Sequence, residues 1–483
     1  MSTGITGRAD AAREKSAALP KELRLSDLVL LQVLLIVGLP WVGYAAKLGG
    51  SHVWLWLAAI VLFYFPLAAT VIFLSRRLPL EGGVYQWVRL GLSPAAGFQA
   101  AWNYAFFLIL YYAASGSVVV NSVSYLLGPR GADITGNKPL ILATGVVFFA
   151  AVYWVNVRGL HLARWITSAG GVLVIALYGL IIALLGWRIA RGEPMAQAPV
   201  SLALPPLTLI TVNLFSKITF NALSGFEQAA IFAGECQTPE RNLARSVWIA
   251  GPGIALLYIL GSCALLAYTP MDKIDLIAPV AQILGASMGS SRAAAALGTA
   301  AIVASLFAYF TITVACLAQV SRLPMVAGWD GLLPARFSEL HLRFRTPVRS
   351  LRLAVAACLV LGAASLVQVG EQEANQILVG AGMACAGMYY LMMFAVVWLA
   401  RWEGEGRAPL WLRGAAAAAA AVTVLSVVMQ NVPILEVRHP WGFAAKVGGA
   451  VAAINLAGWW SGRRALAGAS SAATKATAES CPG

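Results

Sequence analysis

The sequence predicts an all-α polytopic membrane protein. Of its 483 residues 60% are hydrophobic and only 11% are charged, and the mean hydropathy is +0.76. A soluble chain of this length could not bury so much apolar surface, so the composition indicates a chain surrounded mostly by lipid. Every backbone amide and carbonyl in lipid needs a partner within the protein, and helices meet that need in a single segment.

The apolar residues fall into separate stretches, and a stretch of about 20 residues is long enough to cross a bilayer. On this ruler we expect about twelve transmembrane helices, at roughly 27–47, 53–75, 94–127, 139–157, 164–190, 207–235, 246–269, 292–322, 350–369, 376–400, 411–430 and 440–460. They divide the chain into a polar N-terminal tail, two five-helix units, a final helix pair and an Ala/Ser-rich tail predicted to be disordered, at 1–25, 26–190, 207–400, 411–460 and 461–483.

The net charge of +14 has a topological explanation. The basic residues are scattered singly through loops and form no stripe with interleaved aromatic residues, so nucleic acid is not an expected partner. With both termini in the cytoplasm, most Lys and Arg lie in inner segments, as the positive-inside rule requires. We therefore expect a multi-pass protein of the cytoplasmic (inner) membrane. Basic residues of the loop after span eight, from Arg322 to Arg352, would set topology or contact anionic membrane lipid.

Short motifs exclude several classes of function. The six cysteines form no CxxC or His/Cys cluster, so neither a metal site nor a disulfide is expected. The chain has no HExxH, no GxSxG and no GxxxxGK[ST] motif, so we expect no enzyme activity, no cofactor and no nucleotide site.

Two apolar stretches are poor helices in their middle. The first is Val37–Gly43, where proline lies between two glycines. The second is Phe220–Gly225, which contains Asn221, Ser224 and Gly225. A loosened turn at membrane depth survives only where it lines a cavity or is buried in protein. Two such breaks in matching positions of two halves predict a transport site. The candidate residues are Gly38, Leu39, Pro40, Trp41, Val42, Gly43, Phe220, Asn221, Ala222, Leu223, Ser224 and Gly225.

The connectors 74–92 and 269–287 are both amphipathic. One follows span two on the predicted inner side and the other follows span seven on the outer side, as an inverted five-plus-five repeat would produce. The first connector has an equal alternative, a solvated turn with a snorkelling arginine.

Two ionisable residues are predicted at membrane depth, where charge is costly and usually functional. Glu227 would recognise a cation, take part in proton movement, or serve as a structural carboxylate held by helix-end amides. Lys217 would act in coupling by exchanging a proton, attract an acidic substrate side chain, or only snorkel outward.

Four separated stretches carry a family resemblance: LPLEGGVYQWVRLGLSPAAGFQAAWNY, WVNVRGLHLARW, SGFEQAAIFAGECQTPERNLARSV and SRLPMVAGWDGLLP. In this order they resemble bacterial amino acid permeases of the amino acid-polyamine-organocation superfamily. The resemblance implies two inverted five-helix repeats with broken helices 1 and 6, followed by two C-terminal helices. The chain departs from the family's usual small residues at the first break, and it has Trp329 where a charged residue usually precedes Asp330.

The resemblance also implies a function, namely secondary transport of an amino acid by alternating access. Amides after Pro40 would bind its carboxylate and carbonyls near Phe220–Leu223 its ammonium. Family alignment adds Phe107, Leu108 and Tyr111 of helix three to the pocket walls, although Phe107, Tyr111 and Trp41 could each equally be core residues. Tyr104, one turn before Phe107, is a candidate gate residue or a hydrogen-bonded core tyrosine. Proton symport is expected. Exchange, polyamine or organic-cation transport and a transport-dead sensor or accessory subunit remain alternatives, and the oligomeric state stays open.

Overall fold

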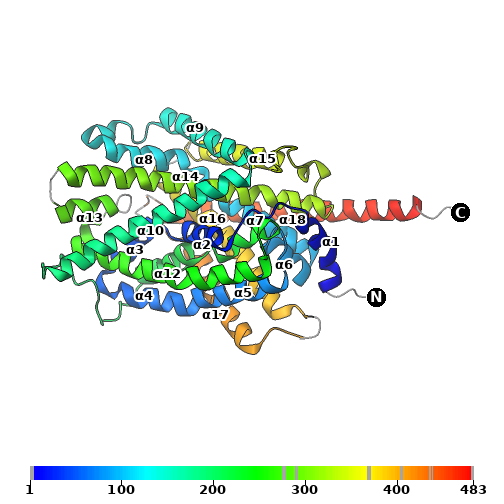
Figure 1. Cartoon of the computed structure of the whole chain (residues 1–483), viewed down its shortest axis with the longest axis horizontal. Helices are drawn as coiled ribbons and strands as arrows, with labels where there is room; N and C mark the ends of the chain where they lie inside the picture. The colour runs from blue at the N-terminus through cyan, green and yellow to red at the C-terminus, as the bar shows by residue number, and fades with distance from the viewer. Residues whose placement is uncertain are drawn as a thin grey trace.

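The computed structural model describes residues 5–274, 279–288, 292–366, 371–402, 406–433, 437 and 439–479. Within these residues the elements are helices, and extended pairing is limited to two isolated bridges, Leu23 with Cys236 and Trp402 with Gly406. The helices run mostly along the long axis of the molecule (Figure 1).

The first half of the chain contains the helices α1 (Ile5–Ala17), α2 (Leu25–Ile36), α3 (Leu39–Ala46), α4 (His52–Ala59), α5 (Phe65–Arg77), α6 (Val84–Gly91), α7 (Pro94–Ala113), α8 (Ser115–Leu127), α9 (Lys138–Val157) and α10 (Leu160–Ala190). Short helical turns complete it, at η1 (Gly49–Ser51), η2 (Ile60–Tyr64) and η3 (Gly128–Asp133).

The second half contains α11 (Leu209–Lys217), η4 (Ile218–Ala222), η5 (Phe226–Glu235), α12 (Pro239–Tyr268), η6 (Met271–Lys273), α13 (Pro279–Met288), α14 (Arg292–Trp329), η7 (Ala335–Phe337), α15 (Val348–Ser365), α16 (Glu371–Leu399), α17 (Leu410–Met429) and α18 (Pro440–Glu479).

In the described part of the chain, nine helical stretches are long and apolar enough to cross a membrane, and the bent pair Leu25–Ile36 and Pro40–Ala46 makes ten. The predicted sixth span is divided among α11, η4 and η5, and the predicted twelfth is α18. The prediction of an all-α polytopic membrane protein is confirmed.

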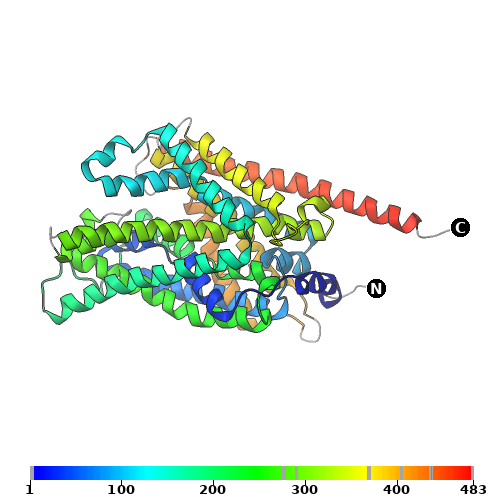
Figure 2. The ribbon, with the colours of Figure 1, turned by 45° about the horizontal axis from the view of Figure 1, so that its top comes forward.

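The C-terminal tail differs from its prediction. Residues from Ser461 to Glu479 continue α18 as a helix instead of being disordered, and the red end of this helix extends beyond the bundle (Figure 2). The tail is rich in alanine, the residue with the highest helix propensity, and it follows directly from a helix that already exists, so no new nucleus is needed.

Helix starts follow from local sequence. The side chains of Ser93, Asn137 and Thr208 accept the amides of residues three positions on, at the starts of α7, α9 and α11. Such caps satisfy amides that have no partner within the helix.

The two amphipathic connectors form helices at opposite ends of the bundle. Figure 1 shows α6 near the end that holds α1, and α13 near the other. Within the second connector, residues 275–278 lie outside the described residues. Most residues of α6 are buried, so this segment packs against the bundle and is not the solvated turn of the alternative. The turn into α6 needs glycine, because Gly82 and Gly83 have φ of 91° and 43° and a Cβ on Gly83 would lie 2.8 Å from the backbone of Ala230.

Candidate functional site

The first helix break lies between α2 and α3. Val37 and Gly38 are extended, with ψ of 108° and 125°, and the two helices meet at an angle of 50°. Pro40 lies in the first turn of α3. Amides of a first turn have no carbonyl partner within the helix, so a proline there costs no hydrogen bond. The break predicted from the sequence is therefore present, with α3 starting at Leu39.

The second break lies at Ser224 and Gly225, between η4 and η5. The helix widens to a π-helical turn over Ile218–Ala222 and ends at Leu223, and Gly225 has φ of 129°, which only glycine adopts without strain. The next ten residues form two short 3₁₀ turns with a kink between them at Phe232, where φ is −93° and ψ is 21°. All ten are buried.

One tyrosine of α12 joins the two breaks. The Tyr258 hydroxyl donates to the Ile36 carbonyl at 2.7 Å and accepts from the Gly38 amide at 3.0 Å. The same hydroxyl lies 3.2 Å from the Ala222 carbonyl, so the last turn before the second break shares its hydrogen. The ring is fully buried and stacks on Trp56. This residue was not predictable from the sequence, because a tyrosine within an apolar helix looks like an ordinary core residue.

Glu227 lies directly after the second break and is fully buried. Its two carboxylate oxygens accept from the hydroxyls of Tyr389 at 2.8 Å and Tyr390 at 2.6 Å, both on α16. The Gly225 amide donates to the Tyr390 hydroxyl at 2.9 Å, which links the carboxylate to the break itself. Among the ion pairs of the described residues, none includes Glu227.

Helix α7 brings aromatic side chains to the same place. The Phe107 ring lies 6.1 Å from Tyr111 and 6.3 Å from Tyr389, measured between ring centroids. Phe107 and Leu108 are buried and Tyr111 is half-buried. The Tyr104 hydroxyl donates to Gln319 Oε1 at 2.6 Å. This bond is one that a core tyrosine would make, and both predicted roles, gate and core residue, stay predictions.

The other predicted residues divide into two groups. Trp41, Val42 and Gly43 are buried on α3, whereas Pro40 is exposed, and the Leu39 side chain lies outside the described residues. Near the second break, the ring centroids of Phe220 and Tyr390 lie 5.4 Å apart. Ser224 is also buried.

Asn221 and Lys217 face the end of α17. Asn221 Oδ1 accepts from Gln430 Nε2 at 3.0 Å. Lys217 is buried and its ammonium donates to the Val432 carbonyl. This contact directs the lysine towards the connection between α17 and α18, whereas Glu227 faces α16.

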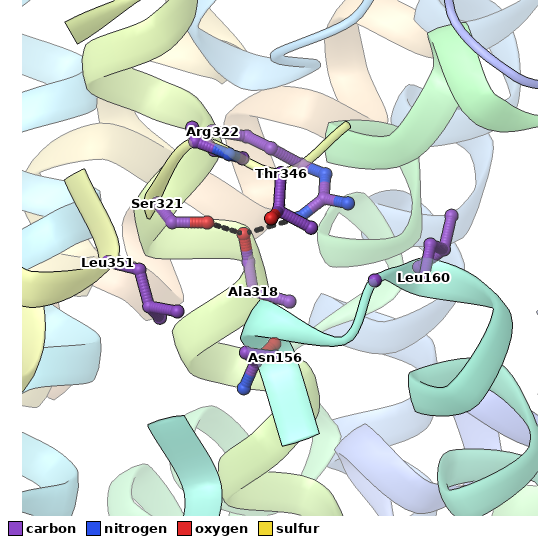
Figure 3. A pocket seen from close by; sticks show the side chains of 9 residues that line it. Asn156, Leu160, Ala318, Ser321, Arg322, Thr346 and Leu351 are labelled. Atoms are coloured by element: carbon purple, nitrogen blue, oxygen red, sulfur yellow. Dashed lines mark hydrogen bonds between the residues drawn. The ribbon is translucent and has the colours of Figure 1, made fainter. Parts of the chain in front are cut away.

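The opposite end of η5 is hydrogen-bonded to the residues just before α2. The Leu23 amide donates to the Glu235 carbonyl at 3.0 Å, and the Gln237 amide donates to the Leu23 carbonyl at 2.9 Å. A pocket nearby is lined by Asn156, Ser321, Arg322, Thr346 and neighbouring residues (Figure 3). Its volume of about 10 Å³ holds roughly one water molecule. The pocket is thus too small for an amino acid.

Residues 23–448 match the amino acid permease family, so the match runs through both breaks and nearly the whole bundle. This chain belongs to that family. The permease is therefore a multi-pass membrane transporter for a small molecule and not an enzyme, and the resemblance to the amino acid-polyamine-organocation superfamily is confirmed.

Relatives of the permease are transporters. It is 25% identical over 378 residues to an uncharacterized transporter of Legionella pneumophila, covering 78% of this chain and 80% of the relative. It is 24% identical to the methylthioribose transporter of Bacillus subtilis, covering 74% and 78%. It is 25% identical to a probable agmatine/putrescine antiporter of Lactococcus lactis, covering 48% of each chain.

A solved structure with a similar fold is that of MhsT in complex with L-phenylalanine. The TM-score is 0.57 with 15% identity, and the match covers 85% of this chain and 100% of MhsT. At this identity the likeness concerns the fold alone.

Proposed function

We propose that the permease carries an amino acid across the cytoplasmic membrane by alternating access, coupled to proton symport. The observation that carries this proposal is the pairing of the two helix breaks, which a single hydroxyl of Tyr258 joins at the centre of the family's fold. Two facing breaks offer backbone amides and carbonyls that a regular helix would use internally.

In this proposal the zwitterion is recognised by the backbone. The substrate carboxylate binds at the first turn of α3, where the amides that begin the helix and the helix dipole favour negative charge. The ammonium binds at carbonyls of the last turn before Ser224, among them that of Ala222. The aromatic rings of Phe107 and Tyr111 then contact the side chain, which favours a neutral and fairly large amino acid.

Glu227 is the proposed proton carrier. Its carboxylate is buried and receives hydrogen bonds from two hydroxyls. These bonds offset only part of the cost of burying a charge that has no ion-pair partner among the described residues. A proton would remove that charge, and Tyr390 connects it to the Gly225 amide at the break. Lys217 is the alternative carrier, but its hydrogen bond leads away from the breaks.

A polyamine or other organic cation is the second candidate substrate. Glu227 offers such a molecule a buried carboxylate, and one relative is described as a probable agmatine/putrescine antiporter. For location we propose the cytoplasmic membrane with both termini in the cytoplasm. In support, α1 and the end of α18 lie at the same end of the bundle (Figure 1), which carries basic loops.

The test is uptake of a radiolabelled amino acid panel into proteoliposomes, with and without an inward proton gradient. We expect gradient-driven uptake by the wild type, with accumulation of up to about tenfold per pH unit for one proton per substrate. Glu227→Gln should lose the gradient response while keeping exchange, and Lys217→Ala should keep the response. If folded protein takes up labelled putrescine or agmatine but no amino acid, the organic-cation proposal replaces this one.

A further inference from the structure

Three charged side chains meet at the end of the bundle that holds α1, away from both breaks. Glu81 comes from the connector between α5 and α6, Glu235 from the end of η5, and Arg322 from α14. All three are buried, with exposed fractions of 0%, 6% and 4%. From the sequence, Arg322 is expected among the loop residues that set topology. In the structure it lies within α14, buried next to Glu81 and Glu235.

The arginine is divided unequally between the two carboxylates. Arg322 Nε and Nη2 donate to the two oxygens of Glu235 at 2.6 and 2.9 Å, the two-pronged geometry that guanidinium and carboxylate prefer. Glu81 Oε1 lies 3.5 Å from Arg322 Nε and has no hydrogen-bond partner among the residues that the structure describes. The other oxygen of Glu81 accepts the Gly234 amide at 2.8 Å. One guanidinium is thus committed to Glu235, and no other cation of the described part of the chain forms an ion pair with Glu81.

The other titratable groups near Glu81 are Lys21 and Cys236, and neither neutralises its negative charge. Lys21 follows α1 and is exposed, and its ammonium donates to the carbonyls of Ser16 and Gly234. The Cys236 thiol, next to Glu235, is buried and donates to the Phe232 carbonyl. Burial and the neighbouring Glu235 raise the pKa of the Glu81 carboxyl, against the opposing effect of Arg322.

We propose that Glu81 binds a proton while the cytoplasmic side of the permease is closed and releases it to the cytoplasm when that side opens. This site is additional to Glu227. It rests on the proposed function only because opening of the cytoplasmic side is a step of alternating access.

The N-terminal segment is what keeps water from Glu81. The Ser16 hydroxyl accepts the amide of Glu81 at 3.1 Å, and Lys15 at the end of α1 donates to the Trp329 carbonyl at 2.7 Å. The bridge between Leu23 and Cys236 holds the residues just before α2 against the end of η5. Opening must break these contacts, and water then reaches the carboxylate. A hydrated carboxyl loses its proton at a lower pH than a buried one.

The sign of the pH effect follows. Because the closed state holds the proton more tightly than the open state, closure is most stable below the pKa of the open state. It weakens as the pH rises towards the raised pKa of the closed state. Within that window the ratio of open to closed protein grows by up to about tenfold per pH unit. No substrate is needed for this effect.

Cys236 provides a native reporter of opening. Purified full-length protein in lipid nanodiscs is treated with N-ethylmaleimide between pH 5.5 and 8.5, and labelling is measured by mass spectrometry. Tryptic cleavage after Lys217 and Arg241 yields a peptide in which Cys236 is the sole cysteine. Rates are divided by those of SDS-unfolded protein at each pH, which corrects for the pH dependence with which an exposed thiol reacts.

We expect the normalised wild-type rate to rise with pH. Glu81→Gln, which lacks the negative charge at every pH, should give a flat profile about tenfold slower than wild type at the upper end. Glu339→Gln is the matched control, because Glu339 is an exposed carboxylate paired with Arg349, and it should keep the wild-type slope.

The inference is overturned by a flat wild-type profile, a result that depends on no variant folding. It is also overturned if Glu81→Gln keeps the wild-type slope or labels faster. Because the readout uses no substrate, it is independent of whether the amino acid proposal holds.

Discussion

Tyr258→Phe removes one hydroxyl and leaves the ring stacked on Trp56. The lost hydroxyl donates to the Ile36 carbonyl and accepts the Gly38 amide, and its contact with Ala222 shares the same hydrogen. Leaving buried backbone groups without a partner costs roughly 1–3 kcal/mol. At 1.4 kcal/mol per factor of ten, the arrangement in which both breaks are held together becomes about 5- to 150-fold less populated.

The assay is the initial rate of uptake into proteoliposomes, normalised to folded protein, together with thermal unfolding in detergent. We expect Tyr258→Phe to transport at least about fivefold more slowly. Tyr178→Phe is the control, because its hydroxyl makes a single longer bond of 3.3 Å to the Gly38 carbonyl, so its loss should change the rate by less than about threefold. A Tyr258→Phe protein that transports at the wild-type rate would refute the role given to this hydroxyl.

Two further substitutions test the surroundings of the second break and the cytoplasmic end. Gly225→Ala should lower stability by about 1–3 kcal/mol, because φ is 129° and the new Cβ would lie 3.0 Å from Ile36 Cγ1. Unfolding in denaturant measures this loss, and an unchanged midpoint would contradict it. Arg322→Met should cost about 3–5 kcal/mol by leaving Glu235 buried without its partner. Adding Glu235→Gln should restore part of that stability, and failure of this rescue would argue against the ion pair.

Both helix breaks were predictable because their signals are local. Pro40 between two glycines, and Asn221, Ser224 and Gly225 in one turn, disfavour a regular helix wherever they occur. The structure ends α2 before the first group and interrupts the sixth span within the second. The helical spacing of apolar residues likewise made the connector helix α6 one of the two predicted alternatives for its segment.

The contacts that hold the site were not predictable, because they join residues far apart in the chain. Tyr258, Tyr389 and Tyr390 lie in apolar helices, where nothing in the neighbouring sequence separates a ligand of a helix break from a core residue. Glu81 and Arg322 stand in separate loop motifs, and basic residues near a membrane edge usually reflect topology. Only the folded structure, in which Arg322 Nε of α14 lies 3.5 Å from Glu81 Oε1, shows that these charges meet.

The structure of the permease with its transported substrate tests the central claim most directly. We predict that the bound molecule lies between Val37–Gly43 and Phe220–Gly225, with its carboxylate at the first turn of α3 and its amine at the carbonyls before Ser224. A substrate bound elsewhere, with both breaks still closed on Tyr258, would contradict the account.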